Sequence, residues 1–476
     1  MLGTRLVVGA FVLALAVAGG CGKKDSDSDR AKSAKPAKPA KASVGMEGGV
    51  ETRASKGGNP STSAGGPGLP GTASASHDAG HTPAGLGEAK LHEPPGPARE
   101  SLDLLSSTDY IEDAQLLARA GACSGDVELP DTLPPKYVRG YCKRLDKAIA
   151  AYRRRWLDKA RPFFHKLVPS GLPQTIVYPF AGADLLSVLA VVPKANDITT
   201  LSLEPAGDPR PLKLLPARRL QRSLSQVGLF AAKLLRISHN RTVDMSEVMT
   251  WGKLPGHIIF TLVGLRIHGF EPVSMRYFLV ERAGGLRYIH RNEVDSLAAA
   301  PNNKKQAVSH RNLPHRLKPW ANVEITFRKQ GDVGGDVRVY RHIRANLHNG
   351  VLDVDDRVVK HLETKGRVTA MTKAASYLLW RSSFSSIRRY LLERMEWMVS
   401  DATGVPPEIA RKAGFEQLTY GQWNRPIRDS NIKPDRVEQM KRFWTKNRVG
   451  SVPFLFGYPA GPGGLHLMVT RPRSAR

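Results

Sequence analysis

The chain has 476 residues, a formal charge of +28 and three cysteines. This length can bury one large core or two smaller ones. The segment Gly22–Glu100 holds eleven Lys/Arg and nine Asp/Glu, so with Arg5 set aside about +25 falls on Ser101–Arg476. A folded part this basic favours anionic partners. Nucleic acid is not expected, because the basic residues are scattered, with Arg153-Arg154-Arg155 the densest run, and no aromatic-rich RNA-binding pattern is present.

The first residues have the pattern of an export signal. Arg5 precedes an apolar run, Leu6–Ala18, which is too short to span a bilayer permanently. The sequence Ala18-Gly19-Gly20-Cys21 resembles the lipobox of bacterial lipoproteins, although strong lipoboxes have Leu in place of Ala18. The resemblance implies a lipidated Cys21 and a membrane-anchored protein of the cell envelope, in the outer membrane facing the periplasm or at the cell surface. A plain secretory signal and an uncleaved anchor are the alternatives.

Cys123 and Cys142 are the two cysteines that remain, nineteen positions apart. Thiols outside the cytoplasm tend to oxidise, so the sequence predicts a disulfide between them, with two buried free thiols as the alternative. Too few cysteines are left for a structural zinc site, and no metal site is predicted.

Composition divides the chain into four parts. Met1–Cys21 is the signal peptide, and Gly22–Glu100, rich in Ala, Lys, Pro, Gly and Ser, is a flexible tether. Residues 101–170 form a helical segment, with helices predicted over Asp109–Ala120 and Lys136–Leu167. Residues 171–476 form an α/β domain.

The α/β domain opens with a predicted parallel βαβ unit. Its strands are Thr175–Phe180 and Ile198–Leu203, and Leu185–Val192 is the crossover helix. The turn between the first strand and the helix presents Tyr178, Gly182 and Asp184 together at one edge of the sheet.

Further elements follow from apolar periodicity and turn residues. Gly256–His268 fits a helix or a strand, and the mixture of crossovers and hairpins indicates a mixed sheet with a parallel βαβ core. Helices are predicted over Leu212–Ile237, Asp353–Leu362, Phe384–Val399 and Asp435–Lys446, hairpins over Val273–Val280 with Leu286–His290 and Val323–Phe327 with Val337–Ile343, and a last strand over Val452–Tyr458.

Several short motifs resemble those of an uncharacterised family of exported bacterial proteins, many of which carry lipoprotein signals. The likeness spans roughly Thr175 to Tyr458. It implies a compartment and a shared architecture, and no established activity. In that family Tyr-Pro-Phe is often followed by Ser-Gly-Pro-Asp, where this chain has Ala181-Gly182-Ala183-Asp184. The motifs are YPFAGAD at Tyr178–Asp184, LEPAGD at Leu203–Asp208, VTAMTKAASY at Val368–Tyr377, DATGVP at Asp401–Pro406 and YGQW at Tyr420–Trp423.

Four charged residues are candidates for catalysis. Asp184, Glu204 and Asp401 end predicted elements, where carboxylates can act as acid and base on a glycan, or can cap helices and close turns. Lys373 is a candidate buried base or anion contact, or an ordinary solvated lysine. The turn after the first strand lacks G-x-G-x-x-G, so no nucleotide cofactor is predicted.

Two hypotheses of different classes follow. In the first, a lipid-anchored envelope protein binds or organises an anionic or glycan component, such as an envelope polymer or lipid headgroups, without turnover. Tyr178, Gly182 and Tyr420 are its candidate binding residues. In the second, an envelope hydrolase or transferase uses Asp184, Glu204 and Asp401. A cleft that gathers these carboxylates with Lys373 and Tyr178 favours the enzyme, and their use as caps favours binding. The sequence does not indicate an oligomeric state.

Overall fold

The computed structural model describes residues 107–125, 127–237, 254–299, 319–423, 434–457 and 465–473, and they belong to one compact unit, Leu91–Arg476. The predicted signal peptide, Cys21 and the tether lie outside the described residues.

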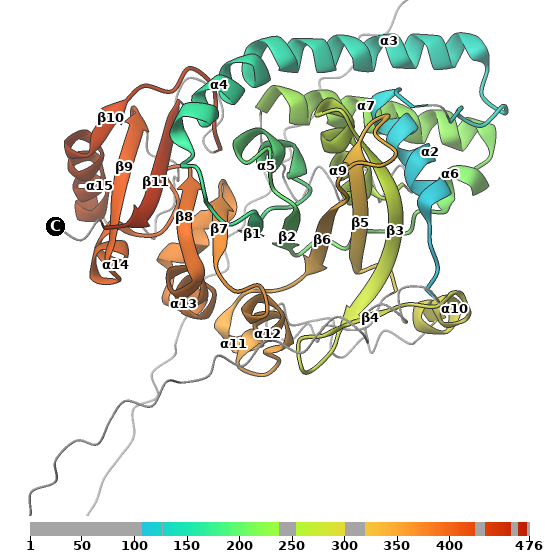
Figure 1. Ribbon diagram of the computed structural model, residues 1–476. Helices are drawn as coiled ribbons and strands as arrows, with labels where there is room; N and C mark the ends of the chain where they lie inside the picture. Colours follow the sequence, from blue (N-terminus) through green and yellow to red (C-terminus); the bar gives the residue numbers. More distant parts are fainter. Residues whose placement is uncertain are drawn as a thin grey trace, which may run out of the picture. The chain divides into compact units, whose positions relative to one another are not determined.

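In this part of the chain eleven strands form one sheet, in the order β10-β9-β11-β8-β7-β1-β2-β6-β5-β3-β4 (Figure 1). The five central strands β8, β7, β1, β2 and β6 are parallel, and antiparallel strands extend the sheet on both sides. The predicted α/β fold with a mixed sheet is therefore confirmed. The bounds are β1 Thr175–Pro179, β2 Asp197–Ser202, β3 Phe270–Val280, β4 Leu286–Tyr288, β5 Asn322–Lys329, β6 Arg338–Arg344, β7 Val368–Thr372, β8 Met395–Ser400, β9 Phe415–Gly421, β10 Arg448–Gly450 and β11 His466–Pro472.

The opening βαβ unit has the predicted form. Strand β1 pairs in parallel with β2 from Thr175 opposite Asp197 to Pro179 opposite Leu201, and α5 (Leu185–Val191) crosses between them. Successive residues of β1 point into different cores, Ile176 and Tyr178 into one and Val177 into the other. Burial on both faces explains why this strand has an almost continuous apolar sequence.

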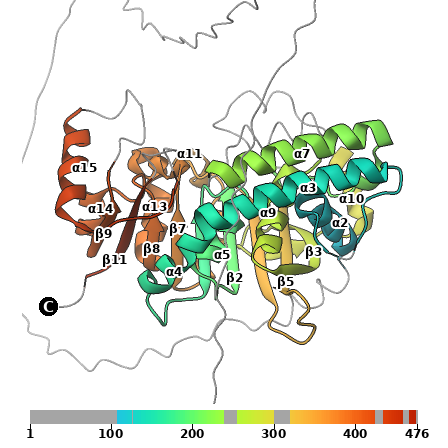
Figure 2. The ribbon, with the colours of Figure 1, turned by 90° about the horizontal axis from the view of Figure 1, so that it is seen from above.

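One face of the sheet is covered by two layers of helices, and Figure 2 shows α3 and α7 lying side by side above α9, α2 and α5. Their inward side chains share the larger core with the sheet. The bounds are α2 Ile111–Ala122, α3 Pro135–Tyr152, η1 Arg153–Leu157, α4 Asp158–Leu167, α6 Pro211–Leu214, α7 Ala217–Ile237 and α9 Gly256–Ile267, with α10 Arg291–Ala299 beside β4.

The opposite face is covered by shorter helices that enclose a second core around Val177, Ala370 and Leu391. The bounds there are α11 Asn349–Leu352, α12 Arg357–Glu363, η3 Ala375–Trp380, η4 Ser382–Phe384 and α13 Ser385–Arg394. Helices α14 (Pro407–Lys412) and α15 (Pro434–Lys446) flank β9 at one end of the sheet (Figure 1). Among the described residues no helix is long and apolar enough to cross a membrane, and no group of three or more potential metal ligands occurs.

Cys123 and Cys142 form a disulfide, with their Cα atoms 5.4 Å apart. The bond joins the end of α2 to the first half of α3, across the Pro-rich loop between them. It therefore fixes the position of α3 on the rest of the helical layer.

The predicted helix Phe384–Val399 is wrong in its second half. The helix α13 ends at Arg394, and Met395–Ser400 is the parallel strand β8. Both faces of β8 are buried, so its apolar residues need no alternation, and Met395 and Met398 continued the helical stripe by coincidence.

The predicted last strand Val452–Tyr458 is also wrong. Val452–Gly457 forms no strand, although Val452, Phe454 and Phe456 are buried, and Tyr458 lies outside the described residues. Phe454 packs on Trp156 with ring centroids 5.5 Å apart, so this apolar run fills the core without pairing. The strand at this end of the chain is β11, which the sequence analysis missed.

Three smaller differences concern helix boundaries. Pro216 divides the predicted Leu212–Ile237 helix into α6 and α7, because proline cannot donate within a helix. The predicted helix Asp353–Leu362 begins only at Arg357, as α12, and the short helix α11 ends before it; the ambiguous Gly256–His268 is helix α9.

Candidate functional site

The carboxyl ends of the central strands meet at a topological switch point. The chain leaves β1 through α5 toward β2 on one side, while β7, on the other side of β1, continues toward β8. Loops that diverge in this way form the usual ligand crevice of open α/β sheets. The loops after β1, β7 and β8 carry Asp184, Lys373 and Asp401.

Asp184 and Lys373 form a buried ion pair at this point. The distance from Lys373 Nζ to Asp184 Oδ2 is 2.8 Å, and the two side chains are 1% and 2% exposed. Asp184 also caps α5, since Oδ1 accepts from the Ser187 amide at 3.2 Å, and Oδ2 accepts from the Tyr178 hydroxyl at 3.1 Å. Lys373 donates to Ser187 Oγ at 2.6 Å and lies 5.3 Å from the centre of the Phe456 ring.

Tyr178 is held as a neutral hydrogen-bond donor in this cluster. Burial, the charge of Asp184 and the hydrogen bond to it raise the pKa of Tyr178 well above 10, and the charge of Asp401 acts in the same direction. The phenol therefore keeps its proton throughout the physiological range and donates it in the hydrogen bond to Asp184 Oδ2.

Two strained residues position the loops around the ion pair. Phe180, the residue after β1, has φ +61°, and Ala374, which follows Lys373, has φ +62°. Backbone of this kind in a residue other than glycine costs on the order of 1–3 kcal/mol and persists only where its surroundings impose it. At Ala374 the constraint is visible, because its amide donates to Asp401 Oδ2 at 2.7 Å.

Asp401 organises the turn after β8. Its Oδ1 accepts from the Thr403 amide at 2.8 Å and from the Thr403 hydroxyl, and the side chain is fully buried. Gly457 has φ +77° and packs so closely that a Cβ there would lie 2.2 Å from Asp401 Oδ2. Asp401 and Lys373 are thus neighbours through Ala374, and the carboxylate bonds to backbone as a turn acceptor does.

The remaining predicted residues lie elsewhere. Glu204 is buried at the end of β2, its carbonyl accepts from His342 Nε2 at 2.8 Å, and in the described part no hydrogen bond or ion pair joins its carboxylate to Asp184 or Lys373. The Gly182 carbonyl lies 3.1 Å from His257 Nε2. Tyr420, on β9, packs edge-on against Phe163 and takes no part in the Asp184 cluster.

The cluster has the geometry of a structural element more than of an exposed reaction centre. A general acid or base must contact the substrate. Asp184, Lys373 and Asp401 are each at most 2% exposed, and their polar atoms bond to neighbouring protein groups.

A second feature, which the sequence analysis missed, is a basic helical face made by α3, η1, α4 and α7. The continuous segment Pro135–Leu167 carries eleven Lys and Arg against Asp146 and Asp158, and α7 carries five with no acidic residue. Helices α3 and α7 are in contact, since the Tyr137 hydroxyl of α3 donates to the Gln221 carbonyl of α7 at 2.7 Å (Figure 2). Residues scattered in the sequence therefore gather on one outer layer.

Most of these cations are exposed and unpaired. In the described ranges no ion pair involves Arg144, Arg154, Arg155, Lys159 or Arg222, and all five are exposed. The inward positions of the same helices are apolar or aromatic and hold the layer on the core. The periodicity of α3 and α7 contained this information, but their packing against each other could not be read from it.

Comparison of the chain with protein-family models, with curated proteins and with solved structures finds no match.

Proposed function

We propose that this protein is a lipid-anchored protein of the cell envelope that binds the anionic headgroups of a phospholipid surface through its basic helical face, without turnover. Cys21 carries the lipid, Gly22–Glu100 is the tether, and the folded part rests on the headgroups of an envelope membrane. The observation that carries the proposal is the concentration of sixteen Lys and Arg against two Asp on α3, η1, α4 and α7.

The dimensions of the face suit an extended surface. Pro135–Leu167 is 33 residues of helix, roughly 50 Å at 1.5 Å per residue, and α7 runs beside α3. Each Lys or Arg close to an acidic membrane contributes about 1 kcal/mol, and the effect decays within a Debye length. A few residues in contact are therefore enough for measurable binding.

Anchor and face would act together. The lipid on Cys21 would hold the protein at a membrane, and a basic patch is a second, electrostatic contribution to membrane binding. The tether keeps the folded part at a high effective concentration near the membrane, so the face needs only moderate affinity of its own.

The alternative of an envelope hydrolase or transferase has less support. Its candidate carboxylates Asp184 and Asp401 are buried and bonded within the protein, whereas Glu204 follows β2 and bonds to His342 through its backbone carbonyl.

The test uses the full chain with Cys21→Ser, so that binding by the folded part is separated from the lipid. We expect it to sediment with vesicles that contain acidic phospholipid and to remain in solution with purely neutral vesicles. Binding should weaken steeply with added salt, because exposed charges are screened. Equal binding to neutral vesicles, or binding to an anionic glycan polymer with none to acidic vesicles, would refute the lipid assignment.

Matched variants locate the surface. The triple variant Arg154→Gln/Arg155→Gln/Arg222→Gln removes three charges from the face. The control Lys194→Gln/Arg282→Gln/Lys329→Gln removes three exposed charges outside α3, α4 and α7. We expect the first to lower vesicle affinity about tenfold or more and the second to change it little. Equal losses would show that net charge alone matters and that the face is not the binding surface.

Anchoring has its own test in cells. Cys21→Ser should release the protein from the membrane fraction at high salt, where the contribution of the face is screened. Continued retention at high salt would show that a lipid on Cys21 is not what holds the protein at the membrane.

A further inference from the structure

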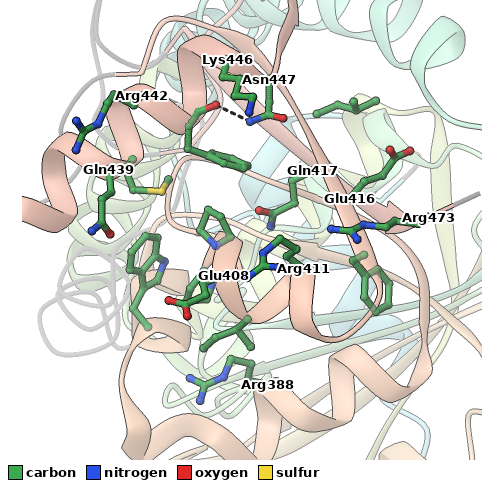
Figure 3. A pocket seen from close by; sticks show the side chains of 18 of the residues that line it. Arg388, Glu408, Arg411, Glu416, Gln417, Gln439, Arg442, Lys446, Asn447 and Arg473 are labelled. Atoms are coloured by element: carbon green, nitrogen blue, oxygen red, sulfur yellow. Dashed lines mark hydrogen bonds between the residues drawn. The ribbon is translucent and has the colours of Figure 1, made fainter.

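A pocket of about 780 Å³ lies at the end of the sheet, between α14, β9 and α15 (Figure 3). It is separate from the basic helical face and from the Asp184 cluster, and no sequence motif predicts it. The volume is within the range of pockets that bury most of a small ligand. Its apolar wall is formed by Trp380, Ile409, Phe415, Met440 and Phe443.

The rim of this C-terminal pocket is cationic. Figure 3 shows guanidinium and ammonium groups from α14, α15 and the residue after β11 around the apolar wall. Four of the five Lys and Arg side chains in the lining are exposed, and among the described residues none of these four takes part in an ion pair. They are Arg411, Arg442, Lys446 and Arg473.

The acidic residues of the lining do not neutralise this rim. Glu408 pairs with Lys412 at 3.2 Å and Glu416 pairs with Arg471 at 2.7 Å, and neither of these two cations lines the pocket. Both carboxylates are thus already compensated from outside. The rim keeps an excess of positive charge, and an anion bound there relieves repulsion among its cations.

One buried acceptor in the lining has no donor. The Gln417 side chain is 6% exposed and its Nε2 donates to the Val405 carbonyl at 2.9 Å and to Thr470 Oγ1 at 3.0 Å. Its Oε1 is buried without a hydrogen-bond partner in the part of the chain that the structure describes. Leaving such an acceptor unsatisfied is unfavourable, and a ligand hydroxyl can satisfy it.

We propose that the C-terminal pocket binds a single-chain anionic amphiphile of the acylglycerol phosphate class. The acyl chain lies against Trp380, Met440 and Phe443, the phosphate pairs with the rim, and a glycerol hydroxyl donates to Gln417 Oε1. Three of the four rim cations are arginines, whose planar forks match phosphate oxygens in pairs. The apolar wall and small volume disfavour an extended polyanion, and a phospholipid with two full chains is too large.

The experiment is titration calorimetry of the full chain, as Cys21→Ser, with 1-acylglycerol 3-phosphates of increasing chain length below their micellar concentration. We expect saturable binding of one molecule per chain, with affinity rising up to about fourfold for each methylene that is buried. Inorganic phosphate and an uncharged monoacylglycerol of equal chain length should each bind far more weakly. Equal affinity for the uncharged lipid, or for phosphate alone, would overturn the proposal.

Matched variants distinguish this pocket from the basic helical face. Arg442→Gln/Lys446→Gln should lower the affinity about tenfold or more. Lys441→Gln/Arg448→Gln removes two exposed charges nearby that do not line the pocket, and should bind as the parent does. The variant Arg154→Gln/Arg155→Gln/Arg222→Gln should also bind as the parent does, so the pocket can fail or succeed independently of the proposed function.

A further outcome would contradict the assignment. Should sedimentation velocity show self-association of the chain that Arg442→Gln/Lys446→Gln abolishes, with no binding of the acylglycerol phosphate, the pocket would be a contact between two copies.

Discussion

Removing the positive partner of the Asp184–Lys373 pair gives the sharpest test of what holds the switch point together. In Lys373→Met the buried Asp184 carboxylate loses its ion-pair partner, while the Tyr178 hydroxyl and the Ser187 amide, both neutral, still donate to it. Breaking one side of a buried pair leaves an uncompensated charge, and typically costs about 3–5 kcal/mol. We expect a loss of that size in the free energy of unfolding.

The assay is urea unfolding of the Cys21→Ser chain, followed by tryptophan fluorescence and by circular dichroism, with coincident curves as the condition for a two-state analysis. Lys360→Met is the control, because Lys360 and Asp356 form an exposed pair in which the side chains are 46% and 57% exposed. That substitution should change stability by less than about 1 kcal/mol.

A double-mutant cycle isolates the pair itself. Asp184→Asn/Lys373→Met removes both charges, so its cost should fall below the sum of the two single losses by 1 kcal/mol or more. A Lys373→Met variant within about 1 kcal/mol of the parent, or strictly additive losses in the cycle, would refute the conclusion that the ion pair stabilises this edge.

Three further predictions concern neighbouring features. Ala374→Gly should raise stability by about 1 kcal/mol in the same urea assay, because glycine adopts φ +62° without strain, and a loss would show that the Ala374 methyl packs usefully. Burial is the main reason why the pKa values of His342 and His361 are lowered to about 4. Around and below about pH 6.5 the unfolded chain therefore binds more protons than the folded chain. Stability should therefore fall between about pH 8 and about pH 5, by about 2 kcal/mol for each histidine, and a flat thermal-unfolding profile over that range would contradict it. Cys123→Ser/Cys142→Ser should lower the free energy of unfolding by about 3 kcal/mol, because the unfolded chain is no longer constrained by the closed loop. An unchanged urea midpoint would show that the disulfide does not stabilise the fold.

The parts of the fold that the sequence revealed are those in which local pattern and tertiary environment agree. The βαβ unit is predictable from the sequence because β1 is almost continuously apolar and the turn after it contains Gly182, which has φ +55°. Asp184 caps α5, one of the two roles that its position allows, because an N-cap carboxylate accepts from an amide three residues on, as it does from Ser187.

The Asp184–Lys373 pair was beyond reach because it depends on strand order. Lys373 follows β7, which lies beside β1 only after the whole region between them has formed the other half of the sheet. Nothing local to either residue specifies that neighbour. The same limit hid the basic helical face, since α3 and α7 are separate in the sequence and adjacent only in the helical layer.

Periodicity failed where a strand followed a helix without a break. Residues of β8 extend the apolar stripe of α13, and no glycine or proline separates them. A fully buried parallel strand has no alternation of its own to oppose that stripe. The strand prediction for Val452–Gly457 was wrong for a different reason. The aromatic residues of this segment are buried in the core, but its backbone does not pair with a strand.

A chain of contacts joins the basic helical face to the Asp184–Lys373 ion pair, and it decides which substitutions can test the two features separately. Trp156 lies within η1 between the basic residues, and its Nε1 donates to the Leu455 carbonyl at 2.5 Å. Leu455 belongs to the segment whose Phe456 lies against Lys373. A change that moves η1 would therefore disturb the ion pair as well. Arg154 and Arg155 project into solvent and can be neutralised without moving the helix, whereas Arg153 donates to the Ile267 carbonyl at 3.1 Å and must be left in place.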